Sequence, residues 1–256
     1  MAGSQAKPVI EVRTLTTHDE FHEAVALQKR IWGFKDIDLL PVRLFVVASK
    51  IGGQALGAFD QGKMIAFGLA IPGIKPGGKF YWHSHMLGVL PEYRNYGVGR
   101  MMKLRQRQDA LARGVDLIEW TFDPLELKNA YFNIERLGAV VRRYVLNQYG
   151  TTSSRLHGGL PTDRCVAEWW LDHPRVRRVV DEGQPLTPPA AAARIAVPAD
   201  IEQIRHKDKR RAREIQERVS SQFVSFFAEG LAVVAFQREE QEGVYLLAPW
   251  DSESNG

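Results

Sequence analysis

The chain has 256 residues, of which 45% are hydrophobic and 25% charged, and its formal net charge at pH 7 is +4. This length and apolar content predict one large domain, or one domain with a small addition, around a hydrophobic core. No apolar run reaches about 18 residues and Met1–Pro8 lacks the apolar centre of a signal peptide, so we expect no transmembrane helix. The one cysteine, Cys165, cannot form an intramolecular disulfide, and the composition is compatible with a cytoplasmic location.

The first 171 residues alternate between strand and helix patterns. Thr17 and Glu20 form a capping box that begins a helix, and Gly33 ends it. Residues 72–78 hold two prolines and three glycines and predict a loop, whereas residues 41–49 are compatible with a helix or a turn region. The predicted strands span residues 9–13, 55–59, 63–71, 80–90, 115–122, 140–148 and 165–171, and the predicted helices span residues 17–32, 101–113 and 125–137.

This order of elements predicts an α/β protein of the α+β kind with a mixed central sheet flanked by helices. After Leu171 the composition changes, because residues 172–198 contain five prolines and an alanine run. Residues 199–227 follow a helical pattern, and residues 230–237 and 243–247 predict a hairpin. We therefore expect a first domain over 1–171, a linker over 172–198, and a helix and β-hairpin extension over 199–256.

Residues 94–100, with the sequence Arg-Asn-Tyr-Gly-Val-Gly-Arg, join the predicted strand 80–90 to the predicted helix 101–113. Glycines lack Cβ atoms, so successive N–H groups can turn toward an anion, and a helix N-terminus adds about half a positive charge. The Gly-x-Gly spacing alone is equally compatible with a tight strand-to-helix turn. Met102 stands where a dinucleotide-binding motif needs its third glycine, and no Walker A run occurs, so we expect another diphosphate-bearing cofactor.

Two segments resemble motifs of the GNAT N-acyltransferase superfamily. Residues 87–99 are similar to its acetyl-CoA-binding motif, Gln/Arg-x-x-Gly-x-Gly/Ala entered from a strand that ends in apolar-x-apolar-x-Pro. Residues 129–139 look like its Asn-x-x-Ala…Leu-Gly-Phe helix, although Ala130 follows Asn129 directly. The resemblance covers residues 9–171 and, with the C-terminal extension, indicates an atypical bacterial subgroup. It implies a GNAT-like, mostly antiparallel sheet and an acyl-CoA-binding catalytic domain over 1–171.

The resemblance also implies acetyl-CoA or succinyl-CoA as the co-substrate, with no metal. In the superfamily the residue that matches Asn129 bonds the pantetheine arm. The residues expected to bind the cofactor are Leu87, Gly88, Val89, Arg94, Asn95, Tyr96, Gly97, Val98, Gly99, Arg100, Asn129 and Phe132.

His83 and His85 stand two residues apart in the strand that precedes the glycine segment. Residues at this spacing share one face of a strand, and imidazole titrates near neutral pH, which suits a base for an attacking amine. They could equally be structural histidines packed beside Trp82, and a metal site has no third ligand in evidence. The arylalkylamine branch of the GNAT superfamily has a similar pair, and by that resemblance His85 is the base, directly or through water, with His83 assisting.

Three further polar residues are candidates for the site. Asp123 ends the next strand before a proline, and it either initiates a turn or holds the substrate amine. Asp163 and Arg164 follow a glycine-rich loop, where the arginine either grips a substrate carboxylate or forms a local salt bridge.

One position departs from the superfamily pattern. Many members place a tyrosine there as general acid to the leaving thiolate, whereas this chain has Ile134, with Tyr131 about one turn earlier as a possible substitute. A free thiol has a pKa near 8.5, so the thiolate can leave without an acid.

The sequence therefore predicts an N-acyltransferase that moves an acetyl or succinyl group directly from CoA to a small primary amine, with an amino acid as a candidate acceptor. The alternative is a non-catalytic sensor that binds acyl-CoA. The basic segment 205–213 is interpreted as a solvated helix face, since no aromatic residues alternate with its charges as nucleic-acid binding would need. A homodimer is compatible with an exposed sheet edge, and we expect no membrane partner.

Overall fold

The computed structural model describes residues 8–150, 160–187 and 190–250. The chain divides into two compact units, unit 1 within Met1–Val115 and unit 2 within Asp116–Gly256. None of the helices in the described residues is long and apolar enough to cross a membrane.

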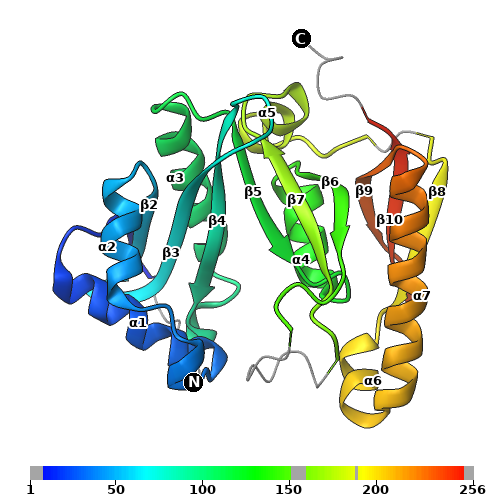
Figure 1. Cartoon of the computed structure of the whole chain (residues 1–256), viewed down its shortest axis with the longest axis horizontal. Coiled ribbons are helices and arrows are strands. Elements are labelled where there is room, and N and C mark those ends of the chain that lie inside the picture. Colours follow the sequence, from blue (N-terminus) through cyan, green and yellow to red (C-terminus); the bar gives the residue numbers. More distant parts are fainter. Residues whose placement is uncertain (1–7, 151–159, 188–189, 251–256) are drawn as a thin grey trace, which may run out of the picture. The chain divides into compact units, whose positions relative to one another are not determined.

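Unit 1 is an antiparallel sheet with helices on both faces. Its strands follow the order β1-β2-β3-β4, and its core contains Phe45, Phe67 and Met102. Figure 1 shows α1 and α2 on one face and α3 on the other. The elements are β1 (Ile10–Thr14), α1 (His18–Trp32), η1 (Asp36–Asp38), α2 (Val42–Lys50), β2 (Gln54–Asp60), β3 (Lys63–Ile74), β4 (Phe80–Val89), η2 (Pro91–Tyr93) and α3 (Val98–Leu111).

Local signals in unit 1 behave as predicted. The capping box of α1 is formed, with the Thr17 side chain accepting from the Glu20 N–H, and Gly33 ends the helix with a φ of 68°. The predicted loop over 72–78 is shorter than expected, because β3 continues to Ile74, which pairs with Phe80 of β4.

Unit 2 contains an antiparallel sheet with the strand order β5-β7-β6-β9-β10-β8. Its elements are β5 (Leu117–Phe122), α4 (Leu127–Tyr131), η3 (Phe132–Arg136), β6 (Val140–Val145), β7 (Arg164–Trp170), α5 (Pro174–Val180), β8 (Ala193–Pro198), α6 (Ile201–Lys207), α7 (Lys209–Ala228), β9 (Leu231–Arg238) and β10 (Glu242–Pro249). The prediction of an α+β fold with a mostly antiparallel sheet is confirmed.

Three predictions for unit 2 need correction. Residues 172–198, expected to form a linker, contain α5 and the strand β8, which pairs with β10. The helix expected over 125–137 is a single turn of α-helix followed by the π-helical turn η3. The helix expected over 199–227 breaks at Asp208, whose side chain accepts from the Arg211 N–H and so caps the start of α7.

The extension is an integral part of unit 2. Strand β9 pairs with β6 through Val141 and Val233, so β9 and β10 continue the sheet of β5–β7. Phe223 of α7 stacks on Tyr144 of β6, with ring centroids 5.1 Å apart. The boundary of the compact units therefore falls before β5, while the sequence suggested boundaries at residues 171 and 198.

Candidate functional site

The segment between β4 and α3 presents main-chain N–H groups at a helix start. Gly97 is the N-cap residue of α3 with a φ of 81°, and Asn95 also has a positive φ, 70°. The first N–H bonded back to this turn is that of Met101, which donates to the Gly97 carbonyl at 3.0 Å. Within the described residues no side chain caps α3, and its first turn holds no acidic residue. The N–H groups at the start of α3 are therefore suited to bind an anion.

Glycine at position 99 is not required by packing. A Cβ atom at Gly99 would meet no atom within 4 Å, and the same is true of Gly97, where the positive φ alone favours glycine. The space beside the first turn of α3 is thus open, and a phosphate group can approach the main chain closely. This fits the diphosphate site that the sequence predicts at Arg94–Arg100, with the guanidinium of Arg94 or Arg100 as a further cation.

Two side-chain contacts hold this segment in place. The Tyr93 hydroxyl donates to Oδ2 of Asp60 at 2.7 Å, at the end of β2. Glu92 accepts from the Arg30 guanidinium of α1 at 3.2 Å. The hydrogen bond to Asp60 raises the pKa of Tyr93. The turn η2 is therefore attached to two other elements of unit 1 directly before the glycine segment begins.

Strand β4 carries a β-bulge at the histidine pair. Leu69 of β3 pairs with Met86, but the next residue, Ala70, pairs with Ser84, which leaves His85 as the extra residue. A bulge reverses the faces on which later residues lie. Ser84 accordingly faces α3, whereas a Cβ atom at Gly88 would lie 2.6 Å from the ring of Trp32 in α1. Gly88 is thus explained by packing against α1.

The two imidazoles are neighbours. The ring centroids of His83 and His85 lie 5.8 Å apart, as expected from residues on one strand face. Burial lowers the pKa of His85 below its ordinary value, which favours the neutral imidazole at pH 7. On the other face, Ser84 accepts a hydrogen bond of 2.9 Å from Nζ of the buried Lys103 in α3. The histidines and the glycine segment therefore belong to one part of unit 1, formed by β4 and the start of α3.

Asp123 lies in unit 2, at the end of β5, and is buried. Its Oδ1 accepts from the Leu125 N–H at 2.8 Å, and its Oδ2 accepts from the Arg205 guanidinium at 2.6 Å. The sequence alone did not reveal Arg205 as a partner of Asp123. Arg205 was assigned to the solvated basic face, yet only 6% of its side chain is exposed. The other basic residues of that face, Lys207, Lys209, Arg210, Arg211 and Arg213, are exposed as predicted.

The second motif forms α4 and η3. Asn129 is exposed and Phe132 is half-buried, so both side chains are accessible to a ligand of unit 2. Ile134 is completely buried in the core. The Tyr131 ring lies beneath the Arg238 guanidinium, whose carbon is 3.8 Å from the ring centroid.

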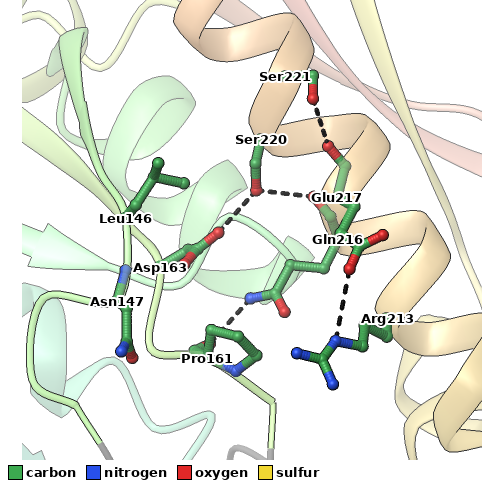
Figure 2. A pocket seen from close by; sticks show the side chains of 9 residues that line it. All are labelled: Leu146, Asn147, Pro161, Asp163, Arg213, Gln216, Glu217, Ser220 and Ser221. Atoms are coloured by element: carbon green, nitrogen blue, oxygen red, sulfur yellow. Dashed lines mark hydrogen bonds and ion pairs between the residues drawn. The ribbon is translucent and has the colours of Figure 1, made fainter.

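Asp163 and Arg164 lie at the start of β7. The Asp163 carboxylate accepts from the Ser220 hydroxyl at 2.7 Å, from the Asn147 N–H at 2.9 Å and from the Tyr144 hydroxyl at 3.3 Å. Arg164 donates to the main-chain carbonyl of Asp163 at 2.9 Å. Asp163 lines a cavity of about 330 Å³ beside α7, and Figure 2 shows Ser220 linking Asp163 to the main chain of α7.

The structure therefore groups the predicted residues into three places. The cofactor segment and the histidine pair share β4 and the start of α3 in unit 1. In unit 2, Asp123 directly follows β5, Asn129 lies in α4 and Phe132 begins η3. Arg164 begins β7, directly after Asp163.

Comparisons with known proteins identify the fold. No protein-family model matches the sequence, and no curated protein matches it significantly. Among solved structures, Arabidopsis thaliana NAA60 in complex with a bisubstrate analogue has a TM-score of 0.51 at 12% identity, and the match covers 63% of this chain and 98% of that one. Arabidopsis thaliana Naa50 in complex with the bisubstrate analogue CoA-Ac-MVNAL has a TM-score of 0.50 at 13% identity, covering 62% of this chain and 97% of that one. The chain described here has the GNAT fold.

Proposed function

We propose that the protein is an acyl-CoA-dependent N-acyltransferase that transfers the acyl group directly from the thioester to a primary amine. The observation that carries the proposal is the pairing of an uncapped, glycine-lined helix start with two adjacent histidines on the strand that leads into it. The first feature suits the diphosphate of CoA, and the second supplies a base for the amine.

The reaction needs a proton acceptor because an aliphatic amine is protonated at neutral pH. His85 is the proposed base: it takes the ammonium proton, directly or through water, and the amine nitrogen then attacks the thioester carbonyl carbon. A new C–N bond forms, the C–S bond breaks, and CoA leaves as the thiolate. The lowered pKa of His85 keeps its imidazole unprotonated at pH 7 and so able to accept. His83, 5.8 Å away between ring centroids, is proposed to assist.

The remaining assignments follow the GNAT resemblance. The start of α3, with Arg94 and Arg100, would bind the diphosphate of CoA. Asn129 and Phe132 would contact the pantetheine arm. Asp123 is proposed to serve the amine, although both of its carboxylate oxygens already accept a hydrogen bond.

The donor is proposed to be acetyl-CoA or succinyl-CoA. The acceptor is proposed to be a small primary amine, with amino acids as the first class to test, because Arg164 with Asp163 would suit a substrate that carries a carboxylate. The complex of Naa50 with the bisubstrate analogue CoA-Ac-MVNAL supports acetyl-CoA as the first donor to test.

The decisive experiment measures thiol release from acetyl-CoA and succinyl-CoA with panels of amino acids, arylalkylamines and polyamines. Turnover by the wild-type chain that is lost in His85→Ala and kept in His22→Ala supports the proposal. His22 is a matched control because it is an exposed histidine of α1 in the same unit. Tight CoA binding without turnover for any pair would favour the second candidate, a non-catalytic acyl-CoA sensor, which the buried Ile134 at the usual acid position would fit.

A further inference from the structure

The turn that joins β5 to α4 is held by the C-terminal part of the chain. Arg205 of α6 donates to Asp123 at 2.6 Å and to Glu126 at 3.0 Å, so one guanidinium bridges the two carboxylates of this turn. Asp123 in turn accepts from the Leu125 N–H at 2.8 Å. The planar fork of arginine suits such a bridge, because it presents several donors in fixed directions.

A second contact reaches the same turn from β10. The Tyr245 hydroxyl, which is completely buried, donates to the main-chain carbonyl of Pro124 at 2.6 Å. Directly beside it, β10 packs on the first residue of α4, since a Cβ atom at Gly243 would lie 2.9 Å from Leu127. Two elements that lie about 80 and 120 residues downstream therefore fix successive residues of this turn.

The turn needs this support because α4 has little stability of its own. It has five residues, none of the described side chains caps its start, and it continues directly into a π-helical turn. A helix this short is marginal without tertiary contacts. The position of α4, and of Asn129 within it, is therefore set by what packs on its first residues.

We propose that Arg205 and Tyr245 are positioning residues for acyl-CoA, which fix the β5–α4 turn and through it Asn129. The inference rests on the proposed function, because Asn129 is assigned there to the pantetheine arm. It gives the C-terminal extension a defined task in cofactor binding. Neither residue is proposed to contact the cofactor.

Within cofactor binding, the contribution of the two residues is confined to the pantetheine end. The start of α3, proposed for the diphosphate, belongs to unit 1, whereas Arg205 and Tyr245 belong to unit 2. A ligand that carries the diphosphate but no pantetheine arm should therefore bind equally well whether or not the β5–α4 turn is intact.

The test compares Tyr245→Phe and Arg205→Lys with the wild-type chain. The controls are Tyr81→Phe, at a half-buried tyrosine of β4, and Arg218→Lys, at an exposed arginine of α7. Tyr245→Phe keeps the ring and removes one hydroxyl, and Arg205→Lys keeps the charge but cannot bridge both carboxylates. We measure kcat and KM for acyl-CoA, and the dissociation constant of ADP, which represents the diphosphate end alone.

The expected result is a rise in KM for acyl-CoA of about tenfold in each variant, with ADP affinity unchanged and the controls like the wild type. A KM that stays within about twofold in folded variants, or an equal loss of ADP and acyl-CoA affinity, overturns the inference. A wild-type chain that neither binds nor uses any acyl-CoA would instead refute the proposed function, which keeps the two failures distinguishable.

Discussion

Replacing Arg205 by methionine should destabilise the fold far more than breaking an exposed ion pair of equal length. Methionine fills much of the volume of the arginine stem but leaves Asp123 and Glu126 without their cation. Only 6% of the Arg205 side chain and 10% of the Asp123 side chain are exposed. Removing one partner of such a buried pair typically costs about 3–5 kcal/mol. For a chain of this size that corresponds to a fall in Tm of roughly 6–20 °C.

Arg194→Met is the matched control. The Arg194–Glu239 pair has the same N–O distance, 2.6 Å, but its side chains are 55% and 45% exposed. An exposed pair of this kind contributes at most about 1 kcal/mol. The two pairs share the same cation and the same distance, and they differ in burial and in the second carboxylate, Glu126, that Arg205 also binds.

The pH dependence of the stability lost in Arg205→Met gives an independent check on the role of Arg205. Burial and the nearby Asp123 raise the pKa of Glu126, while Arg205 opposes that rise. Loss of Arg205 should raise the pKa of Glu126 further, so the folded variant binds this proton more readily than the unfolded chain. The stability that this proton contributes to the variant is fully present below the pKa of Glu126 in the unfolded chain, near 4.3. It is lost as pH rises through the pKa of Glu126 in the folded variant. The destabilisation should thus be larger at pH 8 than at pH 4.5.

Urea unfolding followed by tryptophan fluorescence at both pH values measures these differences. A loss below about 1 kcal/mol at pH 8, equal to that of Arg194→Met, would show that solvent screens the Arg205 pair and would refute the reasoning. A large loss that did not change with pH would refute the part that involves Glu126.

The remaining predictions concern the site in unit 1. Gly99→Asp should leave the fold as stable or slightly more stable, since an acidic side chain stabilises a helix N-terminus by about 0.3–1 kcal/mol. The same change should raise KM for acyl-CoA by more than about tenfold, because the carboxylate repels the diphosphate. An unchanged KM would refute the proposal that the start of α3 binds an anion. Tyr93→Phe should raise KM for acyl-CoA by about three- to tenfold with little change in kcat. Asp60→Asn should have a smaller effect, because the amide oxygen can still accept a hydrogen bond from the Tyr93 hydroxyl. Equal effects of the two variants would contradict the role of the Tyr93–Asp60 hydrogen bond. In a pH profile, kcat/KM should fall as pH decreases through a midpoint below about 6.5, because the pKa of His85 is lowered, and residual activity of His85→Ala should lack that limb.

The local features of unit 1 could be predicted because they depend on neighbouring residues. A capping box needs only Thr17 and Glu20, and the left-handed end of α1 needs only Gly33. The helix start at Gly97 depends likewise on two glycines between a strand and a helix. In each case the hydrogen bonds close within about one turn of chain, so sequence spacing determines the geometry.

The bulge at His85 could not be predicted, because it depends on the pairing of β4 with β3. Period-2 alternation placed both histidines on one face, and their ring centroids lie 5.8 Å apart, although His85 is itself the extra residue of the bulge. It would fail for Gly88, which lies beyond the bulge and packs against α1. The residues after the bulge therefore had no reliable face assignment from sequence.

The burial of Arg205 could not be predicted from the sequence either. A helical pattern placed it with its basic neighbours, and a charged side chain is usually solvated. Its burial requires two carboxylates from a turn about 80 residues earlier, which no local window can contain. The break at Asp208 changes the orientation of α6 relative to α7, so residues 205 and 209–213 do not belong to one continuous helix face.

The absence of a tyrosine at position 134 bears on the choice between an N-acyltransferase and a non-catalytic acyl-CoA sensor. Ile134 is completely buried, so it belongs to the core of unit 2, and Tyr131 is covered by Arg238. Isoleucine has no proton to donate, and the Tyr131 ring is stacked against the Arg238 guanidinium. A thiolate leaving group has a pKa near 8.5, close enough to neutral pH that solvent can protonate it after it departs. The amine, with a pKa about two units higher, has the greater need for a catalyst. His85, the proposed base, would meet that need, and this weighs toward the proposed transferase.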